Sequence, residues 1–189
     1  MGITETDAEL SVPPTEHSGE GHDALFERIV AEYSAPMARL ARAHEADASL
    51  QQDLLQEIHF AIWRSLTAFG GRCSLRTWVY RVAHNVAATH LLRQKRRRLE
   101  SLSTIDELVL EADAPEAAAA LDEQRVLEKL TGLIRRLKPV DRQLIVLHLE
   151  GLAADEIAEI AGLSVSNVHT KLHRIRELLA KRIQSGDIK

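Results

Sequence analysis

Residues 154–168 read ADEIAEIAGLSVSNV, and this stretch has the spacing of a helix-turn-helix. Ala158 is small enough for two helices to cross closely, and Gly162 can adopt the positive φ that a tight turn demands. Ser164 is a suitable N-cap for the second helix. The inner face of that helix is apolar at steps of four, three and four residues: Val168, Leu172, Ile175 and Leu179. Its opposite face is therefore free to bind a partner.

That opposite face combines short hydrogen-bonding side chains with cations, a mixture that suits base edges and phosphates in a DNA major groove. Its members are Ser166, Asn167, His169, Thr170, Lys171, His173, Arg174 and Arg176. A solvated helix face is the alternative, but the small residue, the glycine, the apolar inner face and the cations coincide here. His169 and His173 also have the spacing of a metal-binding pair. Because no third ligand lies nearby in the sequence, we expect no metal site.

The segments just before this motif are also helical. One helix is predicted over 127–137 and stops before Pro139, and another is predicted over 144–149 and ends at Gly151. Together with the helix-turn-helix they form one small helical domain.

A second helical domain is predicted closer to the N-terminus. Its first helix runs over 23–41, and Pro36 starts a new helix or bends the old one. Further helices are predicted over 50–68 and 75–97, separated by the break at Gly70 and Gly71. We therefore expect an all-α fold with two small helical domains.

Charge is strongly segregated along the chain, although the net charge is only -4. Residues 71–98 contain no acidic residue and the following cations: Arg72, Arg76, Arg81, Arg93, Lys95, Arg96, Arg97 and Arg98. Residues 99–124 contain acidic residues and no cation. Trp78, His84 and Asn85 lie among the cations, and such groups can stack on bases and read their edges. The basic tract favours a polyanion partner, with pairing between the basic and acidic segments as the alternative.

The charge and periodicity together predict the division of the chain. The expected segments are a disordered leader over 1–22, a helical domain over 23–98, a flexible acidic linker over 99–121, a helix-turn-helix domain over 122–184 and a tail over 185–189.

Composition excludes several classes of protein. The chain of 189 residues is 45% hydrophobic but only 4% aromatic, which argues against a large β architecture. Its single cysteine, Cys73, excludes an internal disulfide framework and fits a reducing compartment. We find no apolar run that could cross a bilayer and no signal peptide, so we expect a cytoplasmic protein.

Several motifs, taken in order, resemble one protein family. The segment 53–58, followed by Trp63, is similar to region 2.2 of the extracytoplasmic-function (ECF) sigma factors, which are members of the sigma-70 family. The segment 77–87 resembles regions 2.3 and 2.4. Similarity to region 4 of the same family is found in the segments 137–142, 156–158, 162–165 and 172–176. The resemblance covers nearly all of residues 23–183.

The resemblance implies binding to core RNA polymerase and to promoter DNA, without a covalent step, a metal or a cofactor. The polymerase-binding residues would be Asp53, Gln56, Glu57, Ile58 and Trp63. The minus-10 element would be bound by Arg76, Thr77, Trp78, Arg81, Asn85 and Arg93, and the minus-35 element by the outer face of the helix-turn-helix. An anti-sigma factor is the implied regulator, and the acidic linker could imitate nucleic acid in the polymerase cleft.

Two other readings remain open. The chain could be an operator-binding helix-turn-helix regulator, or an adaptor that mimics a sigma factor to sequester its antagonist. The basic tract over 71–98 argues against both, because a sensor domain or a decoy would not need it. An enzyme is disfavoured, since Cys73 and the scattered histidines show no catalytic spacing.

Overall fold

The computed structural model describes residues 21–102 and 121–184, and the regular structure in these ranges is helical. The helices are α1 (His22–His44), α2 (Ala48–Ser65), the short 3-10 helix η1 (Leu66–Ala68), α3 (Leu75–Leu102), α4 (Leu121–Arg135), α5 (Pro139–Leu149), α6 (Ala154–Ala161) and α7 (Val165–Gln184). The expected all-α class is confirmed. The predicted tail and most of the predicted leader and acidic linker lie outside the described residues, and α1 begins at His22, the last residue of the predicted leader.

The first domain consists of α1, α2 and α3, with α2 packed against both of the other helices. The α2 helix begins at an N-cap, Asp47, whose side chain accepts a hydrogen bond from the Leu50 amide at 3.0 Å. Leu54, Ile58 and Ile62 recur at steps of four on its buried face. They bury apolar surface against α1 and α3, which stabilises the three helices as one unit.

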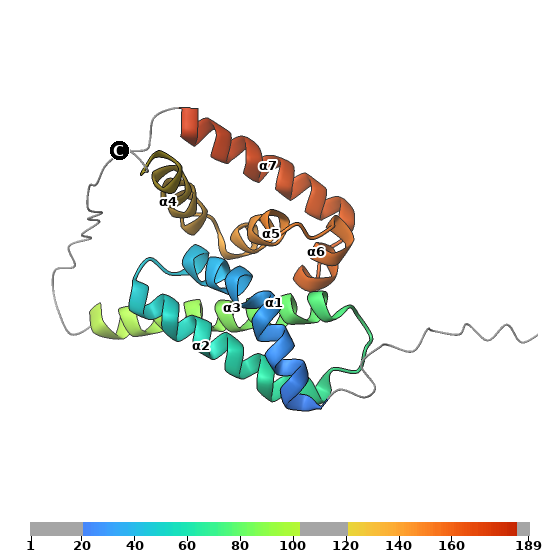
Figure 1. The fold of residues 1–189 in the computed structure, drawn as a ribbon. Helices are drawn as coiled ribbons and strands as arrows, with labels where there is room; N and C mark the ends of the chain where they lie inside the picture. Colours follow the sequence, from blue (N-terminus) through green and yellow to red (C-terminus); the bar gives the residue numbers. More distant parts are fainter. Residues whose placement is uncertain (1–20, 103–120, 185–189) are drawn as a thin grey trace, which may run out of the picture.

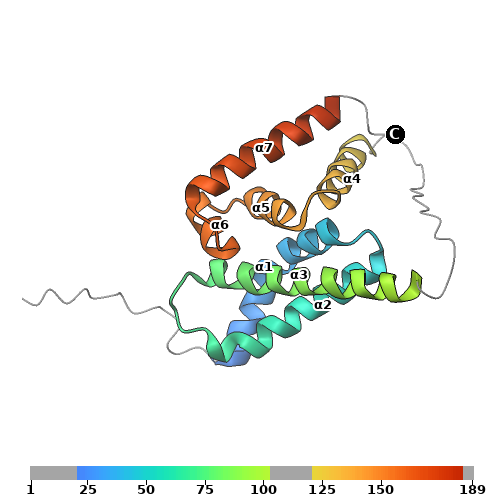
Figure 2. The same ribbon diagram turned by 180° about the vertical axis from the view of Figure 1, so that it is seen from behind.

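Pro36 lies inside α1 and does not start a new helix. The two halves of α1 nevertheless run in different directions in both views (Figures 1 and 2). A proline removes one backbone hydrogen bond and crowds the preceding turn, which accounts for a change of direction within a continuous helix. The second of the two predicted alternatives, a bend, is therefore the one observed.

The second domain contains the expected helix-turn-helix. Gly162 ends α6 with a φ of 66°, and Ser164 caps α7 by accepting a hydrogen bond from the Asn167 amide at 3.3 Å. Ala158 is buried where α6 meets α7, and the four predicted inner-face residues of α7 are all buried. The turn, the cap and the inner face are thus confirmed.

The two domains pack directly on one another. In Figure 1 the helices α4 to α7 lie over one side of α1 and α3, and the view from behind in Figure 2 agrees. α6 and α5 contact α3, while α4 and α5 contact α1. Buried side chains of both domains form one continuous core cluster. The sequence did not predict this arrangement.

Candidate nucleic-acid interface

The outer face of α7 is open to solvent over most of its predicted DNA-binding residues. The side chains of Ser166, Asn167, His169, Thr170, His173, Arg174 and Arg176 are all exposed. The burial of Val168 and Leu172 against α5 and α6 determines which face of the helix these residues occupy. The result is a continuous polar and cationic helix face of the kind that fits a major groove.

Lys171 differs from its neighbours because it is half-buried and paired within the domain. Its Nζ donates to Asp141 Oδ1 of α5 at 3.1 Å. This ion pair ties α7 to α5 and reduces the freedom of the lysine to reach a phosphate. Lys171 therefore contributes to the position of α7 as well as to its charge.

A second cationic face follows α3. Trp78, Arg81 and Asn85 are spaced at steps of three and four, so they lie on one side of the helix. The Trp78 ring is half-buried against Phe69, with ring centroids 5.3 Å apart, while Asn85 is exposed. An aromatic ring, a cation and an amide on one face can contact a base and the adjacent phosphate.

Two predicted members of this surface have other partners. Thr77 is buried and closes the start of α3, where its amide donates to Ser74 Oγ at 3.0 Å and the two hydroxyls are 2.8 Å apart. Thr77 is 2% exposed and therefore has no surface for DNA in this structure, and its assignment to the minus-10 element stays a prediction. Arg76 is half-buried and donates from Nη2 to the backbone oxygen of Glu150 at 2.6 Å.

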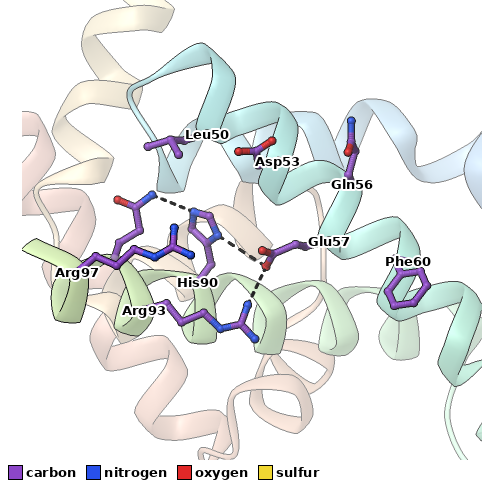
Figure 3. A pocket seen from close by; sticks show the side chains of 9 residues that line it. Leu50, Asp53, Gln56, Glu57, Phe60, His90, Arg93 and Arg97 are labelled. Atoms are coloured by element: carbon purple, nitrogen blue, oxygen red, sulfur yellow. Dashed lines mark hydrogen bonds and ion pairs between the residues drawn. The ribbon is translucent and has the colours of Figure 1, made fainter.

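A groove of about 430 Å³ runs between α2 and α3 (Figure 3). Three residues predicted to bind polymerase, Asp53, Gln56 and Glu57, line its α2 side. Arg93, predicted to bind DNA, lies on its α3 side and donates to Glu57 Oε2 at 3.4 Å. Glu57 of the predicted polymerase surface and Arg93 of the predicted minus-10 surface are therefore paired across the groove.

The fourth predicted polymerase contact, Ile58, is 0% exposed in the core between the helices, so in this structure it supports α2 from the inside and offers no surface to a partner. Trp63 is exposed as predicted, and it stacks with Phe60 at a ring-centroid distance of 6.3 Å. Phe60 is 60% exposed, and the Arg64 guanidinium lies 5.8 Å from its ring centre. The sequence analysis missed Phe60, although an aromatic residue three positions before Trp63 is the signal that could have identified it.

Two histidines are buried without polar partners beneath these surfaces. The His44 and His84 rings lie 6.1 Å apart, and both His44 nitrogens and His84 Nε2 have no hydrogen-bond partner among the described residues. Burial, with the nearby Arg142 and His90, lowers the pKa of His44 to about 3. Burial and the neighbouring His44 lower the pKa of His84 to about 3. Both imidazoles are therefore neutral at pH 7.

A third buried histidine, His90, connects three elements. Its Nε2 lies 3.1 Å from Glu45 Oε1, and its Nδ1 lies 3.7 Å from Glu57 Oε2 (Figure 3 shows the Glu57 side). These contacts join α3 to α2 and to the residue that follows α1. They fix the floor of the groove next to Arg93.

Glu150, which follows α5, connects the two domains. Its carboxylate accepts two hydrogen bonds from Arg39 of α1, from Nε and Nη2, each at 2.7 Å. The Tyr80 hydroxyl of α3 lies 3.4 Å from the same carboxylate. The Glu150 side chain is only 8% exposed, and its hydrogen bond raises the pKa of Arg39. This is a bidentate, largely desolvated contact of the strong kind.

Two further contacts cross the same interface. Arg81 Nη2 donates to Glu159 Oε1 of α6 at 2.5 Å. At the other end of the interface, Arg135 of α4 donates to the backbone oxygens of Arg42 and Glu45, at 3.1 and 3.4 Å. Across this interface, cations therefore come from both domains, and the carboxylates of Glu150 and Glu159, which bind Arg39 and Arg81, come from the second domain.

Metal and membrane sites were sought in the same ranges. Among residues 21–102 and 121–184, no cluster of three or more His, Cys, Asp or Glu side chains has a geometry that could bind a metal ion. None of the described helices combines the length and apolarity required to cross a bilayer.

Comparison with known proteins identifies both domains. The family model described as "Sigma-70 region 2" matches residues 29–97, and the one described as "Sigma-70, region 4" matches residues 127–179. The RNA polymerase sigma-H factor of Pseudomonas aeruginosa is 30% identical over 173 residues, which cover 87% of this chain and 89% of the relative. The ECF RNA polymerase sigma-E factor of Escherichia coli K12 is 28% identical and matches 87% of this chain and 90% of its own.

Solved structures share the fold. The structure of CnrH in complex with the cytosolic domain of CnrY matches with a TM-score of 0.63 at 22% identity, over 89% of this chain and 92% of that chain. The sigma factor RpoE in complex with the anti-sigma factor NepR, from Bartonella quintana, matches with a TM-score of 0.67 at 19% identity, over 84% and 96%. With both family regions and relatives along most of its length, the chain belongs to the sigma-70 family and is an ECF sigma factor that directs transcription initiation.

Proposed function

We propose that this protein binds core RNA polymerase and brings it to specific promoters, with its first domain on the minus-10 element and its second on the minus-35 element. The observation that carries the proposal is that one chain has two separate cationic helix faces, on α3 and α7, and a third surface of exposed aromatic and acidic residues on α2. An operator-binding protein needs only the α7 face.

The α3 face is suited to the minus-10 element because opening DNA exposes single-stranded bases. Asn85 is exposed and can pair with the edge of an extruded base, while Trp78 provides a ring and Arg81 a phosphate contact. Arg93 extends the positive charge about two turns beyond Asn85. Extrusion of a base requires a few kcal/mol, which these contacts would offset.

The α7 face is suited to double-stranded minus-35 DNA. Ser166, Asn167 and Thr170 near the start of α7 are short enough to read base edges, and Arg174 and Arg176 follow for phosphates. The helix N-terminus also favours the approach of a phosphate. The minus-35 sequence that these residues prefer is a subject for experiment.

The α2 surface is suited to a protein partner. Phe60 and Trp63 form an exposed, stacked aromatic pair, and Asp53, Gln56 and Glu57 lie on the groove side of the same helix. Aromatic residues surrounded by polar ones are typical of the centre and rim of an interface. We assign this surface to core polymerase.

We also infer regulation by an anti-sigma factor, which is the kind of partner present in the solved RpoE–NepR complex. The protein would act in the cytoplasm together with polymerase and would itself perform no covalent step.

The proposal is tested by mixing the full-length chain with core RNA polymerase, measuring co-elution, and transcribing a promoter library from the source genome. We expect co-elution and initiation at a subset of promoters. Binding to DNA without binding to core polymerase would overturn the proposal in favour of an operator-binding regulator. Core binding without any promoter-specific initiation would favour a sigma-mimicking adaptor.

A variant separates the two expected roles of the first domain. Asn85→Ala should leave co-elution with core polymerase unchanged and reduce promoter opening, measured by permanganate reactivity of unpaired thymines. Trp63→Ala is the converse variant. Because Trp63 lies on the surface assigned to polymerase, this change should reduce co-elution with core polymerase. Equal loss of both activities in Asn85→Ala would contradict the assignment of Asn85 to DNA.

A further inference from the structure

Two cations of the predicted minus-10 surface, Arg76 and Arg81, are bound by the second domain in this structure. Arg81 is paired with Glu159, and Arg76 donates to the backbone oxygen of Glu150. Arg39 and Tyr80 of the first domain converge on the Glu150 carboxylate. Each of these acceptors belongs to the helix-turn-helix domain.

The chemistry of the acceptors resembles that of DNA. A carboxylate bound by the two nitrogens of a guanidinium has the same fork geometry as an arginine-bound phosphate. Glu150 binds Arg39 in this fork geometry, and Glu159 presents to Arg81 of α3 the negative charge that a phosphate would present. DNA and the helix-turn-helix domain cannot both occupy Arg81, since its Nη2 is only 2.5 Å from Glu159.

We propose that, in the free protein, the helix-turn-helix domain acts as a built-in competitor of minus-10 DNA. Glu159 takes the position of a phosphate on Arg81, the Glu150 backbone oxygen occupies Arg76, and the Glu150 carboxylate holds the domain in place through Arg39. This inference rests on the assignment of Arg76 and Arg81 to the minus-10 element. The domains must separate before the α3 face can bind DNA, so the sigma factor is closed until a partner such as polymerase separates them.

The contact at Glu150 controls the strength of this competition. Its side chain is 8% exposed, whereas Arg39 is 51% exposed. Loss of Arg39 would leave a buried carboxylate without its main partner, which disfavours the closed form strongly. Loss of the Glu150 charge would leave Arg39 without its partner but in contact with solvent. This change would also favour the open form. Neither residue belongs to the proposed DNA-binding surfaces, so both are suitable for a test.

The first measurement is the distance between the domains in the full-length chain. Cys73→Ser removes the native thiol, and Gln52→Cys on α2 with Ala180→Cys on α7 provides two exposed sites for fluorescent labels. We expect high energy transfer in this background and lower transfer after Glu150→Gln or Arg39→Ala. The swap Arg81→Glu with Glu159→Arg should keep the high transfer, whereas either change alone should reduce it.

The second measurement is the affinity for nucleic acid, with a fluorescent single-stranded 15-nucleotide DNA of random sequence as the probe. Apparent affinity falls in proportion to the fraction of molecules that are open. Glu150→Gln should therefore bind the probe about 3- to 10-fold more tightly than the wild type. Glu128→Gln, an exposed position on α4 with the same change of charge, is the matched control and should change affinity much less.

The outcomes separate this inference from the proposed function. The inference would be overturned by low energy transfer in the labelled protein before Glu150 or Arg39 is changed. It would also be overturned if Glu150→Gln and Glu128→Gln gave the same energy transfer and the same DNA affinity. Opening without tighter DNA binding would also overturn it, because the closed form would then cover no DNA site. None of these measurements contains polymerase, so failure of the chain to bind core polymerase would contradict the proposed function alone.

Discussion

Arg174 and Arg176 lie exposed on the face of α7 that we assign to the minus-35 element, where they would contact phosphates. Each phosphate contact releases a counterion from DNA, so the loss of a contact reduces the dependence of binding on salt. We predict that replacing both with Ala weakens binding of the polymerase complex to promoter DNA and lowers the slope of log affinity against log salt by about 1 to 2. An unchanged slope in a salt titration would place the phosphate contacts elsewhere.

The two buried histidines make the folded state sensitive to acid. The pKa of His44 and of His84 is about 3 in the folded protein and near the ordinary 6.5 in the unfolded chain, so below pH 6.5 the unfolded chain binds more protons. Their contribution to stability is complete above about pH 6.5 and is lost as the pH falls toward 3. At pH 5.5 the loss is about 1.4 kcal/mol for each histidine.

This pH dependence is measured by urea unfolding at pH 7.5 and 5.5. We predict that the double variant His44→Gln, His84→Gln loses less free energy of unfolding between the two pH values than the wild type loses. His173→Gln, on the exposed face of α7, is the control and should behave like the wild type. The same pH dependence in the double variant would show that other groups cause the acid sensitivity.

Single residues were predictable from sequence where local periodicity determines their environment. Val168 and Leu172 are buried because they recur on one side of a helix, and Asn85 is exposed on the side of α3 away from the core. Ile58 and Thr77 were assigned to binding surfaces but are buried. A motif indicates that a segment belongs to a surface, but a helix in that segment also has an inner side.

At the scale of elements, the turn between α6 and α7 has an unusual backbone requirement. Gly162 has a φ of 66°, and a Cβ atom there would meet no heavy atom within 4 Å. Gly162→Ala should therefore destabilise the protein through backbone strain alone, by about 1 to 2 kcal/mol. Gly132 lies inside α4, where Gly132→Ala should instead stabilise by about 0.5 to 1 kcal/mol.

The two glycine variants are compared by thermal and urea unfolding under one set of conditions. Opposite signs of the change in unfolding free energy are the expected result. Stabilisation by Gly162→Ala would mean that the turn adopts another conformation in solution.

Elements were predicted well where the sequence contains both a period and a stop signal. The end of α5 before Gly151 and the end of α6 at Gly162 are as expected, whereas α5 begins at Pro139 and not at the predicted residue 144. The α3 helix continues to Leu102, beyond the predicted end at 97, since charge composition does not end a helix in the way that glycine or proline does.

At the scale of the whole molecule, the interface contains one buried and one exposed ionic contact, and salt should affect them differently. Glu150 is buried, whereas the Arg81 and Glu159 side chains are 35% and 49% exposed. Screening acts mainly on exposed charges. We predict that raising NaCl from about 0.05 to about 0.5 M lowers energy transfer between the domains.

The control is the same titration with Glu159→Gln, in which the exposed pair is absent. Its energy transfer should be lower than that of the wild type at low salt and should change less as salt rises. Identical salt dependence in both proteins would show that the Arg81–Glu159 pair has no influence on the distance between the domains.

The arrangement of the domains could not be predicted from the sequence. Arg39 and Glu150 are 111 residues apart, and Arg81 and Glu159 are 78 apart. No local period or spacing motif relates such positions. The alternative reading, in which the basic tract pairs with the acidic tract over 99–124, concerns residues that lie mostly outside the described ranges. Arg76 and Arg81 contact residues of the second domain.

The position of Glu150 has a consequence for the exchange of parts between relatives. Sigma factors of this class invite the construction of chimeras, in which a promoter-reading domain is transplanted to change the set of genes that are switched on. In this protein the transplanted domain would take Glu150 with it and leave Arg39 and Tyr80 behind. A chimera that keeps both α3 and α7 intact would still be misregulated. Its incoming domain must also provide a carboxylate at the position of Glu150 that can bind the arginine of the recipient protein.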